Sequence, residues 1–394
     1  MKKVGIITHY YNSNNYGGLL QAYALYYVLS KMGVQAEQIS YKQIEFPILN
    51  SKEMKNERIN FKWLINKIKI VSNNIAKNVM KSLKKYENMR KYSTLEQLME
   101  KRKKKNMEFR ELIPHSRVFT DDSINEISEF YDYYITGSDQ VWNPYMFSYA
   151  YFLKFVTKKK KIAYAASIAV GNLTNKQKDV IIPLISSFDY ISVREESAKH
   201  IIEKEISNSI DVVVDPTLLL AKDDWEKIEK KVNIGENYLF TYLLGESKKN
   251  RKIIRKIAKE KGLKIVSVPH LYFQYEPSDE DFADIELYDI GPAEFISLIH
   301  NASLIITDSF HGCVFSIIFE KEFYSLNRND NFDLSSMNSR IIDLFKMLDM
   351  EDRTILNINQ SIETFEKLNY NIIKKQLKIK TVDSMDYLKK TLES

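Results

Sequence analysis

Cysteine is nearly absent from this chain. Its 394 residues include one, Cys313, which excludes an internal disulfide and a cysteine-rich metal site. Such low cysteine use is consistent with a reducing, cytoplasmic setting. Cys313 stands where a small buried residue is expected, so we interpret it as a packing residue rather than a nucleophile.

Long apolar runs are missing as well. No segment approaches the roughly 20 apolar residues of a transmembrane helix, and Met1 is followed by an apolar strand pattern rather than by a signal peptide. We therefore expect a cytoplasmic protein. With 44% hydrophobic residues, a chain of this length can form two ordinary domains, each with its own core.

Positive charge is scarce outside one segment. The formal net charge is +6, but residues 51–110 hold 18 Lys and Arg against 6 Asp and Glu, a net charge of +12, which leaves about −6 for the remainder. The segment has a helical period, and we predict a basic helical insertion at about 49–110. Its run Lys101-Arg102-Lys103-Lys104-Lys105 indicates either a solvated helix face or peripheral contact with the anionic inner face of a membrane. We expect no nucleic-acid partner.

Strands and helices alternate outside the insertion. The pattern predicts strands at 4–9, 34–41, 131–136, 161–167, 189–193, 210–214, 238–244, 263–268, 304–306 and 322–327. It predicts helices at 19–32, 175–187, 248–261, 292–301 and 336–348, with others starting at 195 and 310. The alternation is typical of an α/β fold with two doubly wound domains, at 1–220 and 221–358. Residues 359–394 are predicted to be a tail of two amphipathic helices.

The stretch Ser303–Arg328 reads as strand, sharp turn and helix. An apolar run is followed by Asp308 and Ser309, and His311 stands at or just inside the predicted helix start. Unpaired N–H groups at a helix start favour anions, and a histidine can move a proton near neutral pH. The alternative is that Asp308 and Ser309 only cap the helix while His311 packs.

Polar residues collect where the predicted strands end. Ligands of doubly wound sheets bind beyond the carboxyl ends of the strands, so this clustering favours a functional site. The residues are His9, Asn14, Asn15, Gly137, Ser138, Asp139, Gln140, Ser167, Arg194, Asp215, Asp308, Ser309, His311 and Arg328.

A series of motifs runs through residues 4–345. In chain order they are Gly5-Ile6-Ile7, Asn14-Asn15-Tyr16-Gly17-Gly18, Gln21-Ala22-Tyr23-Ala24-Leu25, Gly137-Ser138-Asp139-Gln140-Val141-Trp142-Asn143, Tyr164-Ala165-Ala166-Ser167, Ser192-Val193-Arg194-Glu195, Val214-Asp215-Pro216-Thr217 and Asp308-Ser309-Phe310-His311-Gly312. The ordered set resembles the polysaccharide pyruvyl transferase family, in a branch marked by Ser-Phe-His-Gly.

The resemblance implies two Rossmann-like domains facing across a cleft, as in glycosyltransferase-B-like folds. It implies that phosphoenolpyruvate gives its pyruvyl group to a sugar of a surface-polysaccharide precursor, usually as a cyclic ketal, with release of phosphate. The acceptor would be a lipid- or nucleotide-linked glycan, and no metal or other cofactor would be required. Two other functions stay open: a nucleotide-sugar-dependent glycosyltransferase, and a non-catalytic α/β binding protein of a polysaccharide assembly system.

The resemblance also suggests a donor site. Arg194 matches the family's arginine, and a guanidinium suits the carboxylate and phosphate of phosphoenolpyruvate. Better-known relatives carry Arg-Leu-His where this chain has Ser309-Phe310-His311, so one arginine is missing. Arg328 and Arg340 are candidates for the missing cation, with a surface ion pair as the alternative for either. Further donor contacts are expected from Ser309, Phe310 and Gly312.

Catalytic roles are expected for two residues. His311 would protonate the methylene carbon of phosphoenolpyruvate or stabilise the departing phosphate. Asp139 would activate an acceptor hydroxyl, or would instead form an Asx-type cap on its turn. Trp142 would stack on a sugar ring or belong to the core. Further substrate contacts, with a plain tight turn as the alternative for the first five, are expected from Asn14, Asn15, Tyr16, Gly17, Gly18, Ser138 and Gln140.

Overall fold

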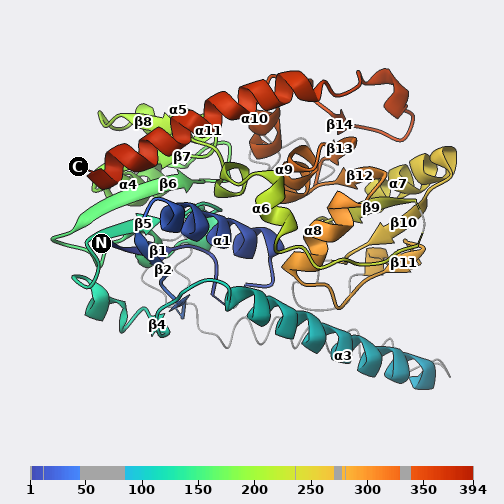
Figure 1. The fold of residues 1–394 in the computed structure, drawn as a ribbon, viewed down its shortest axis with the longest axis horizontal. Helices are drawn as coiled ribbons and strands as arrows, with labels where there is room; N and C mark the ends of the chain where they lie inside the picture. Colours follow the sequence, from blue (N-terminus) through green and yellow to red (C-terminus); the bar gives the residue numbers. More distant parts are fainter. Residues whose placement is uncertain are drawn as a thin grey trace.

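Two parallel sheets form the framework of the protein. The computed structural model describes residues 2–11, 13–44, 85–235, 237–269, 277–279, 281–328 and 339–393, and the two sheets lie side by side (Figure 1). The first sheet has the strand order β2-β1-β5-β6-β7-β8. Its strands are β1 (Lys3–Ile7), β2 (Gln35–Gln38), β5 (Tyr133–Thr136), β6 (Lys160–Ala166), β7 (Tyr190–Val193) and β8 (Ile210–Val212).

The second sheet has the strand order β11-β10-β9-β12-β13-β14. Its first strand in the sequence, β9, lies in the middle. The chain adds β10 and β11 on one side of β9 and then β12, β13 and β14 on the other side, as in dinucleotide-binding folds. All ten predicted strands are present, with ends shifted by at most three residues, whereas β11 and β14 were not expected. The strands are β9 (Tyr238–Tyr242), β10 (Lys264–Ser267), β11 (Ile285–Glu286), β12 (Leu304–Thr307), β13 (Phe323–Leu326) and β14 (Thr354–Ile355).

The helix ends follow from local sequence signals. In α7 (Lys248–Lys261) the Ser247 side chain accepts from Asn250 N at the start, and Gly262 ends the helix in the left-handed conformation (φ 62°). The expected bounds of this helix are confirmed. The other helices of the two domains are α1 (Tyr16–Lys31), α4 (Asn175–Ser186), α5 (Glu196–Glu203), α6 (Lys222–Glu226), α8 (Pro292–His300), α9 (Phe310–Ile318) and α10 (Ser339–Met347).

Shorter elements connect these helices and strands. A small parallel sheet pairs β3 (Tyr41–Lys42) with β4 (Phe119–Thr120). The 3-10 helices are η1 (Ile124–Ile127), η2 (Pro144–Met146), η3 (Tyr149–Phe152), η4 (Pro216–Leu219), η5 (Pro277–Asp279) and η6 (Ile362–Thr364).

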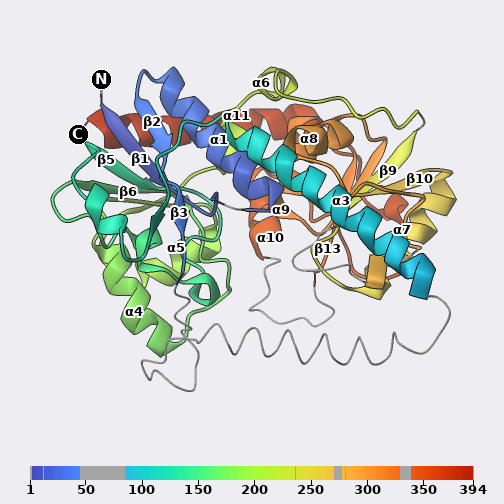
Figure 2. The same ribbon diagram turned by 90° about the horizontal axis from the view of Figure 1, so that it is seen from below.

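Helix α3 (Lys85–Arg110) spans both domains (Figure 2). It packs against α1 of the first domain and α8 of the second, and Lys105 pairs with Glu294 (3.1 Å). The expected solvated face is correct for Lys101, Lys103 and Lys104, which are exposed, and wrong for Arg102. Arg102 is buried because its guanidinium donates to three carbonyl oxygens, those of Pro269 (2.9 Å), Leu287 (3.2 Å) and Tyr288 (2.7 Å).

The predicted membrane arm can be compared with the structure only in part. Residues 49–84 of the predicted insertion lie outside the described residues. None of the described helices combines the length and the apolar character needed to cross a bilayer. The peripheral membrane contact therefore stays a prediction.

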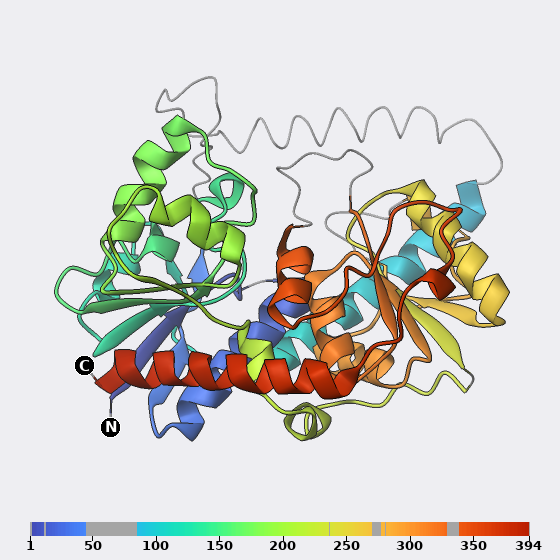
Figure 3. The same ribbon diagram turned by 90° about the horizontal axis from the view of Figure 1, so that it is seen from above.

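The C-terminal tail contains one long helix rather than two. Helix α11 (Tyr370–Glu393) follows the short η6 and returns from the second domain to the first (Figure 3). Ser384 Oγ accepts from Val214 N (3.0 Å), and Tyr387 donates its hydroxyl to Ala163 O (2.8 Å). The tail was expected to be two helices, but the period continues unbroken through α11 because no proline or glycine interrupts it.

A continuous apolar core joins the two domains. Tyr16, at the start of α1, stacks on Phe295 of α8 (ring centroids 5.0 Å apart) and donates its hydroxyl to Ile290 O (2.7 Å). Trp225 contacts Tyr23 from one domain and Phe315 from the other. The loops that follow the strands of the two sheets are therefore held close to each other.

Candidate active site

Polar residues and a glycine follow the strands at the switch point of each sheet, where successive strands change sides. In the first sheet β1 and β5 flank this point, and His9 and Asp139 come after them. In the second sheet β9 and β12 flank it, and Gly245 and Asp308 come after them. Doubly wound sheets bind ligands in the crevice at these points.

A buried arginine–aspartate pair forms the centre of the candidate site. Arg194, after β7, donates from Nη1 to Asp215 Oδ2 (2.9 Å), and both side chains are almost fully buried. Ser138 Oγ donates to the same oxygen (2.9 Å), and Thr217 donates to Oδ1 from its N (3.0 Å) and Oγ1 (2.6 Å). Burial opposes ionisation of Asp215, but the charges of His311 and Arg194 and the hydrogen bonds from Thr217 hold its pKa well below the usual range.

His311 brings the second domain to this pair. It lies in the first turn of α9, as predicted, where Ser309 Oγ accepts from Gly312 N (3.3 Å). Its Nε2 is 3.5 Å from Asp215 Oδ2, which is an ion-pair distance without hydrogen-bond geometry. Only 7% of His311 is exposed. The imidazole therefore lies in the contact between the domains, next to the buried Asp215 carboxylate.

Asp308 does not cap α9. Its carboxylate accepts from Leu244 N (2.6 Å) and Gly245 N (2.8 Å), which anchors the loop after β9. Burial raises the pKa of Asp308, and the charge of Arg328 opposes this shift. The capping alternative is therefore correct for Ser309 and wrong for Asp308.

Helix α1 begins three residues earlier than expected. The Asn15 side chain accepts from Gly17 N (3.0 Å), so residues 16–18 form the first helical turn instead of ending a polar loop. A methyl group on Gly17 would lie 2.0 Å from His311 Nδ1, and one on Gly18 would lie 2.7 Å from His9 O. The two glycines are therefore needed because the bare helix start touches both histidine residues.

Three arginines concentrate positive charge at the site. The Arg194 guanidinium lies 4.1 Å from the centre of the Phe310 ring, and its Nε and Nη2 have no hydrogen-bond acceptor in the described part of the chain. Burial and the charges of Arg194 and Arg328 lower the pKa of Arg340 to about 9. Arg340 is thus buried near Arg194 rather than in a surface ion pair, and Arg328 is half-buried. Buried donors without acceptors, next to like charges, favour an anionic ligand.

Two acidic residues of the site were not assigned a role from the sequence. Asp215 follows β8, and Glu195 follows Arg194, so their places after strands were the available signal. Glu195 Oε2 is 3.6 Å from Arg194 Nε, and Oε1 accepts from Ser167 Oγ. Burial raises the pKa of Glu195, against the charges of Arg194 and Arg340. Glu195 therefore offsets only part of the positive charge of these arginines.

The residues expected to contact the acceptor are dispersed. Tyr16 is 1% exposed, and its hydroxyl donates to Ile290 O of the other domain. Trp142 is fully buried in an apolar core within the first domain. The structure places neither at an accessible surface. Asn14 is exposed, Gln140 is half-buried, and Ser138 is buried against Asp215.

Asp139 has the left-handed backbone conformation (φ 72°), which an aspartate adopts at some cost. It is 5% exposed. Its carboxylate accepts no hydrogen bond from the described residues, so the Asx-type cap is not formed there. Its charge acts on His9, Arg194 and Arg340, which places it at the site.

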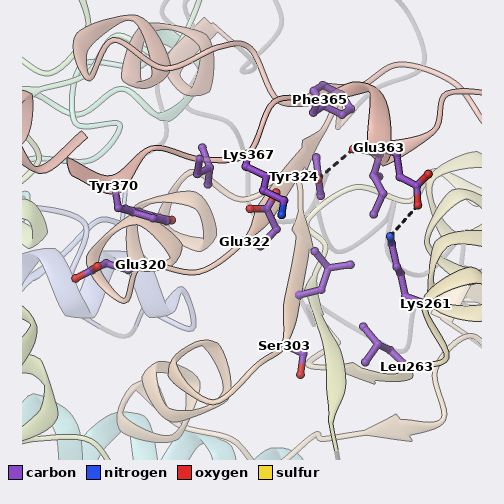
Figure 4. A pocket seen from close by; sticks show the side chains of 13 residues that line it. Lys261, Leu263, Ser303, Glu320, Glu322, Tyr324, Glu363, Phe365, Lys367 and Tyr370 are labelled. Atoms are coloured by element: carbon purple, nitrogen blue, oxygen red, sulfur yellow. Dashed lines mark hydrogen bonds and ion pairs between the residues drawn. The ribbon is translucent and has the colours of Figure 1, made fainter. Parts of the chain in front are cut away.

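A pocket of about 830 Å³ lies elsewhere, at the end of the second sheet where its strands begin (Figure 4). Its lining includes residues that precede strands, such as Leu263, Ser303 and Glu322. Glu322 pairs with Arg353, and Lys261 pairs with Glu363 (3.2 Å). Since none of the expected site residues lines it, we do not assign the active site to this pocket.

Comparisons of structures identify the fold. A UDP-GlcNAc 2-epimerase from Methanocaldococcus jannaschii, in complex with UDP-GlcNAc and UDP, aligns with a TM-score of 0.50 at 14% identity, covering 96% of this chain and 92% of its own. A Listeria monocytogenes protein assigned as a UDP-N-acetylglucosamine 2-epimerase aligns with a TM-score of 0.51 at 13% identity, covering 98% and 90%. At this identity the likeness shows a shared glycosyltransferase-B-like fold and nothing of the activity.

Comparisons of sequence identify the family. No curated protein gives a significant match. The family described as polysaccharide pyruvyl transferase matches residues 15–331, which include the buried pair, His311 and the start of α1. The chain therefore belongs to the polysaccharide pyruvyl transferase family.

Proposed function

We propose that this protein transfers the pyruvyl group of phosphoenolpyruvate to a sugar of a surface-polysaccharide precursor, forming a ketal and releasing phosphate. Family membership supports pyruvyl transfer in polysaccharide biosynthesis. One observation supports phosphoenolpyruvate as the donor: the buried Nε and Nη2 atoms of Arg194 have no hydrogen-bond acceptor among the described residues. A carboxylate or phosphate oxygen would complete their hydrogen bonds.

The donor anion would lie between the domains. Arg194 is fixed by Asp215, so its remaining donors keep one direction, and Arg340 adds a second buried cation. Arg340 is destabilised by burial and by its positive neighbours, and an anionic ligand would relieve that repulsion. We therefore assign to Arg340 the cation that the Ser309-Phe310-His311 motif lacks.

His311 would act as the general acid. Protonation of the methylene carbon of phosphoenolpyruvate turns it into a methyl group and leaves positive charge on the neighbouring carbon. The proton would come from His311, held against Asp215 at 3.5 Å, and a positioned acid contributes about 10²–10⁴-fold. One sugar hydroxyl then adds to the charged carbon, and a second displaces phosphate and closes the ketal.

The acceptor, lipid- or nucleotide-linked, and a cytoplasmic location near a membrane are parts of the proposal that rest on the resemblance. A nucleotide-sugar-dependent transferase and a non-catalytic binding protein are the competing outcomes of the test below. The former would turn over a UDP-hexose without phosphoenolpyruvate. The latter would turn over neither.

The test incubates the protein with phosphoenolpyruvate and a panel of p-nitrophenyl hexosides and UDP-hexoses. We expect phosphate release together with an acceptor that gains the mass of pyruvate less one water. His311→Ala should reduce the rate by at least about 10²-fold, with thermal unfolding showing that the fold is retained. His200→Ala is the control because His200 is exposed on α5. Equal rates for His311→Ala and the control would exclude His311 as the acid.

A further inference from the structure

A second histidine and a second aspartate lie at the switch point of the first sheet. His9 follows β1 and Asp139 follows β5, and these strands are paired neighbours in the sheet. The negative charge of Asp139 favours the protonated form of His9. The His9 ring also packs on Tyr151 of η3, with ring centroids 4.4 Å apart. In the described part of the chain, Asp139 and Tyr151 are the titratable groups that face His9.

The start of α1 connects this pair to the centre of the site. A methyl group on Gly18 would lie 2.7 Å from His9 O and 3.6 Å from Asp139 Oδ2, whereas one on Gly17 would contact the His311 ring. Two successive residues of one helical turn therefore lie against His311 of the second domain and against the backbone of His9 in the first. Asp139 also acts electrostatically on Arg194 and Arg340, so His9 and Asp139 lie on the side of the first domain that carries these arginines.

The hydrogen bond of His9 fixes its tautomer. Nε2 is 3.2 Å from the carbonyl oxygen of Gln140, and a carbonyl can only accept, so Nε2 carries the proton. Nδ1 then holds the lone pair, and it has no partner among the described residues. Burial lowers the pKa of His9, which outweighs the opposite effect of Asp139. At neutral pH the ring is therefore neutral, with one free basic nitrogen.

We propose that His9 is the general base that takes the proton from the sugar hydroxyl as it adds to the pyruvyl carbon, and that Asp139 is a positioning residue that acts through His9. The inference rests on the proposed function and replaces Asp139 as the group that activates the acceptor. The hydroxyl O–H bond breaks as the new C–O bond forms, and the proton moves to Nδ1. Asp139 stabilises the imidazolium that results.

The protons balance over the whole reaction. His311 gives one proton to the methylene carbon, and His9 removes one from the first hydroxyl. The second hydroxyl loses its proton as phosphate leaves, and the phosphate group takes up a proton in place of its bond to carbon. No oxidant or reductant is required. A base and an acid on opposite domains can therefore act in sequence on one bound pyruvyl group.

The test measures kcat/KM against pH for His9→Gln, Asp139→Asn and the control His200→Gln, using the p-nitrophenyl hexoside that the wild-type protein pyruvylates best. His9→Gln should lower kcat/KM by about 10²-fold or more and remove the acidic limb of the profile. Calorimetric titration should show that it binds phosphoenolpyruvate as the wild type does. Asp139→Asn keeps a residue that accepts the left-handed backbone. The profile of this variant should keep the acidic limb but show it at lower pH, because the negative charge of Asp139, which raises the pKa of His9, is gone.

The outcomes separate the two residues and the two proposals. If Asp139→Asn removes the acidic limb while His9→Gln keeps it, Asp139 is the base and the inference is wrong. If His9→Gln does not fold, the pH profile of Asp139→Asn still tests the inference. An acidic limb at the same pH as in the wild type would contradict an effect of Asp139 on His9. If the wild-type protein itself shows no transfer from phosphoenolpyruvate, the proposed function fails before the role of His9 is reached.

Discussion

Gly17→Ala offers a direct test of how the two domains meet. Gly17 lies in the first turn of α1, and a methyl group there would lie 2.0 Å from His311 Nδ1, 2.5 Å from Cγ and 2.7 Å from Cε1. Such distances are not tolerated, so the substitution must displace the imidazole or separate α1 from α9. Either change breaks the 3.5 Å approach of His311 to Asp215.

The expected magnitude combines two opposing effects. In a helix, alanine in place of glycine usually stabilises by about 0.5–1 kcal/mol. Overpacking a buried contact costs about 1–3 kcal/mol, and His311 is 7% exposed with packed surroundings. We therefore expect a net loss of about 1–2 kcal/mol in the free energy of unfolding, together with loss of pyruvyl transfer.

Urea unfolding of four proteins measures this effect: wild type, Gly17→Ala, His311→Ala and the double variant. Removing the imidazole makes room for the methyl group, so Gly17→Ala should be neutral or stabilising in the His311→Ala background. The coupling between the two substitutions then identifies the clash itself. A Gly17→Ala protein that is as stable and as active as the wild type would refute the close approach of His311 to α1.

The remaining predictions concern the buried pair. Asp215→Asn should cost about 3 kcal/mol of stability at neutral pH, because Arg194 loses its buried counter-charge. Folding lowers the pKa of Asp215. The stability that its carboxylate contributes is therefore fully present above an ordinary aspartate pKa of about 3.9 and is lost as the pH falls towards the pKa in the folded state. Urea unfolding from pH 7 down to pH 3 should show that the difference in the free energy of unfolding between wild type and variant becomes smaller. Arg194→Gln should weaken phosphoenolpyruvate binding by at least about 1.5 kcal/mol in calorimetry, whereas Arg117→Gln, at an exposed position, should bind as the wild type does. Wild-type affinity in Arg194→Gln would remove Arg194 from the donor site.

Much of the fold could be predicted from the sequence because its signals are local. Apolar strands, the caps of α7 and the strand–turn–helix pattern around His311 are each encoded within a few residues. The start of α1 was misplaced because Gly17 and Gly18 are typical of turns, and only the ring of His311 explains why glycines are needed inside the helix. That contact joins residues almost 300 positions apart, which no local pattern encodes.

The sequence predicts where the site residues lie in the fold, but not which of them contact one another. The sequence placed Arg194, Asp139 and His311 at strand or helix ends, but it could not show that Asp215 links Arg194 to His311, since the link depends on how the domains pack. Arg102 illustrates the same limit, because a basic run reads as a solvated face until its carbonyl partners are known. The sequence marks His9 only as a polar residue after a strand, because its tautomer depends on a contact with Gln140 O.

The proposed transfer to a sugar depends on protonation of the methylene carbon of phosphoenolpyruvate by an acid whose proton exchanges with solvent. The most direct test is to run the reaction in deuterium oxide and to examine the pyruvyl methyl group of the purified product by mass spectrometry and proton NMR. We predict a ketal whose methyl group carries one deuterium, formed together with one phosphate. Phosphate release that yields only free pyruvate, or a modified sugar whose methyl group lacks deuterium, would contradict it.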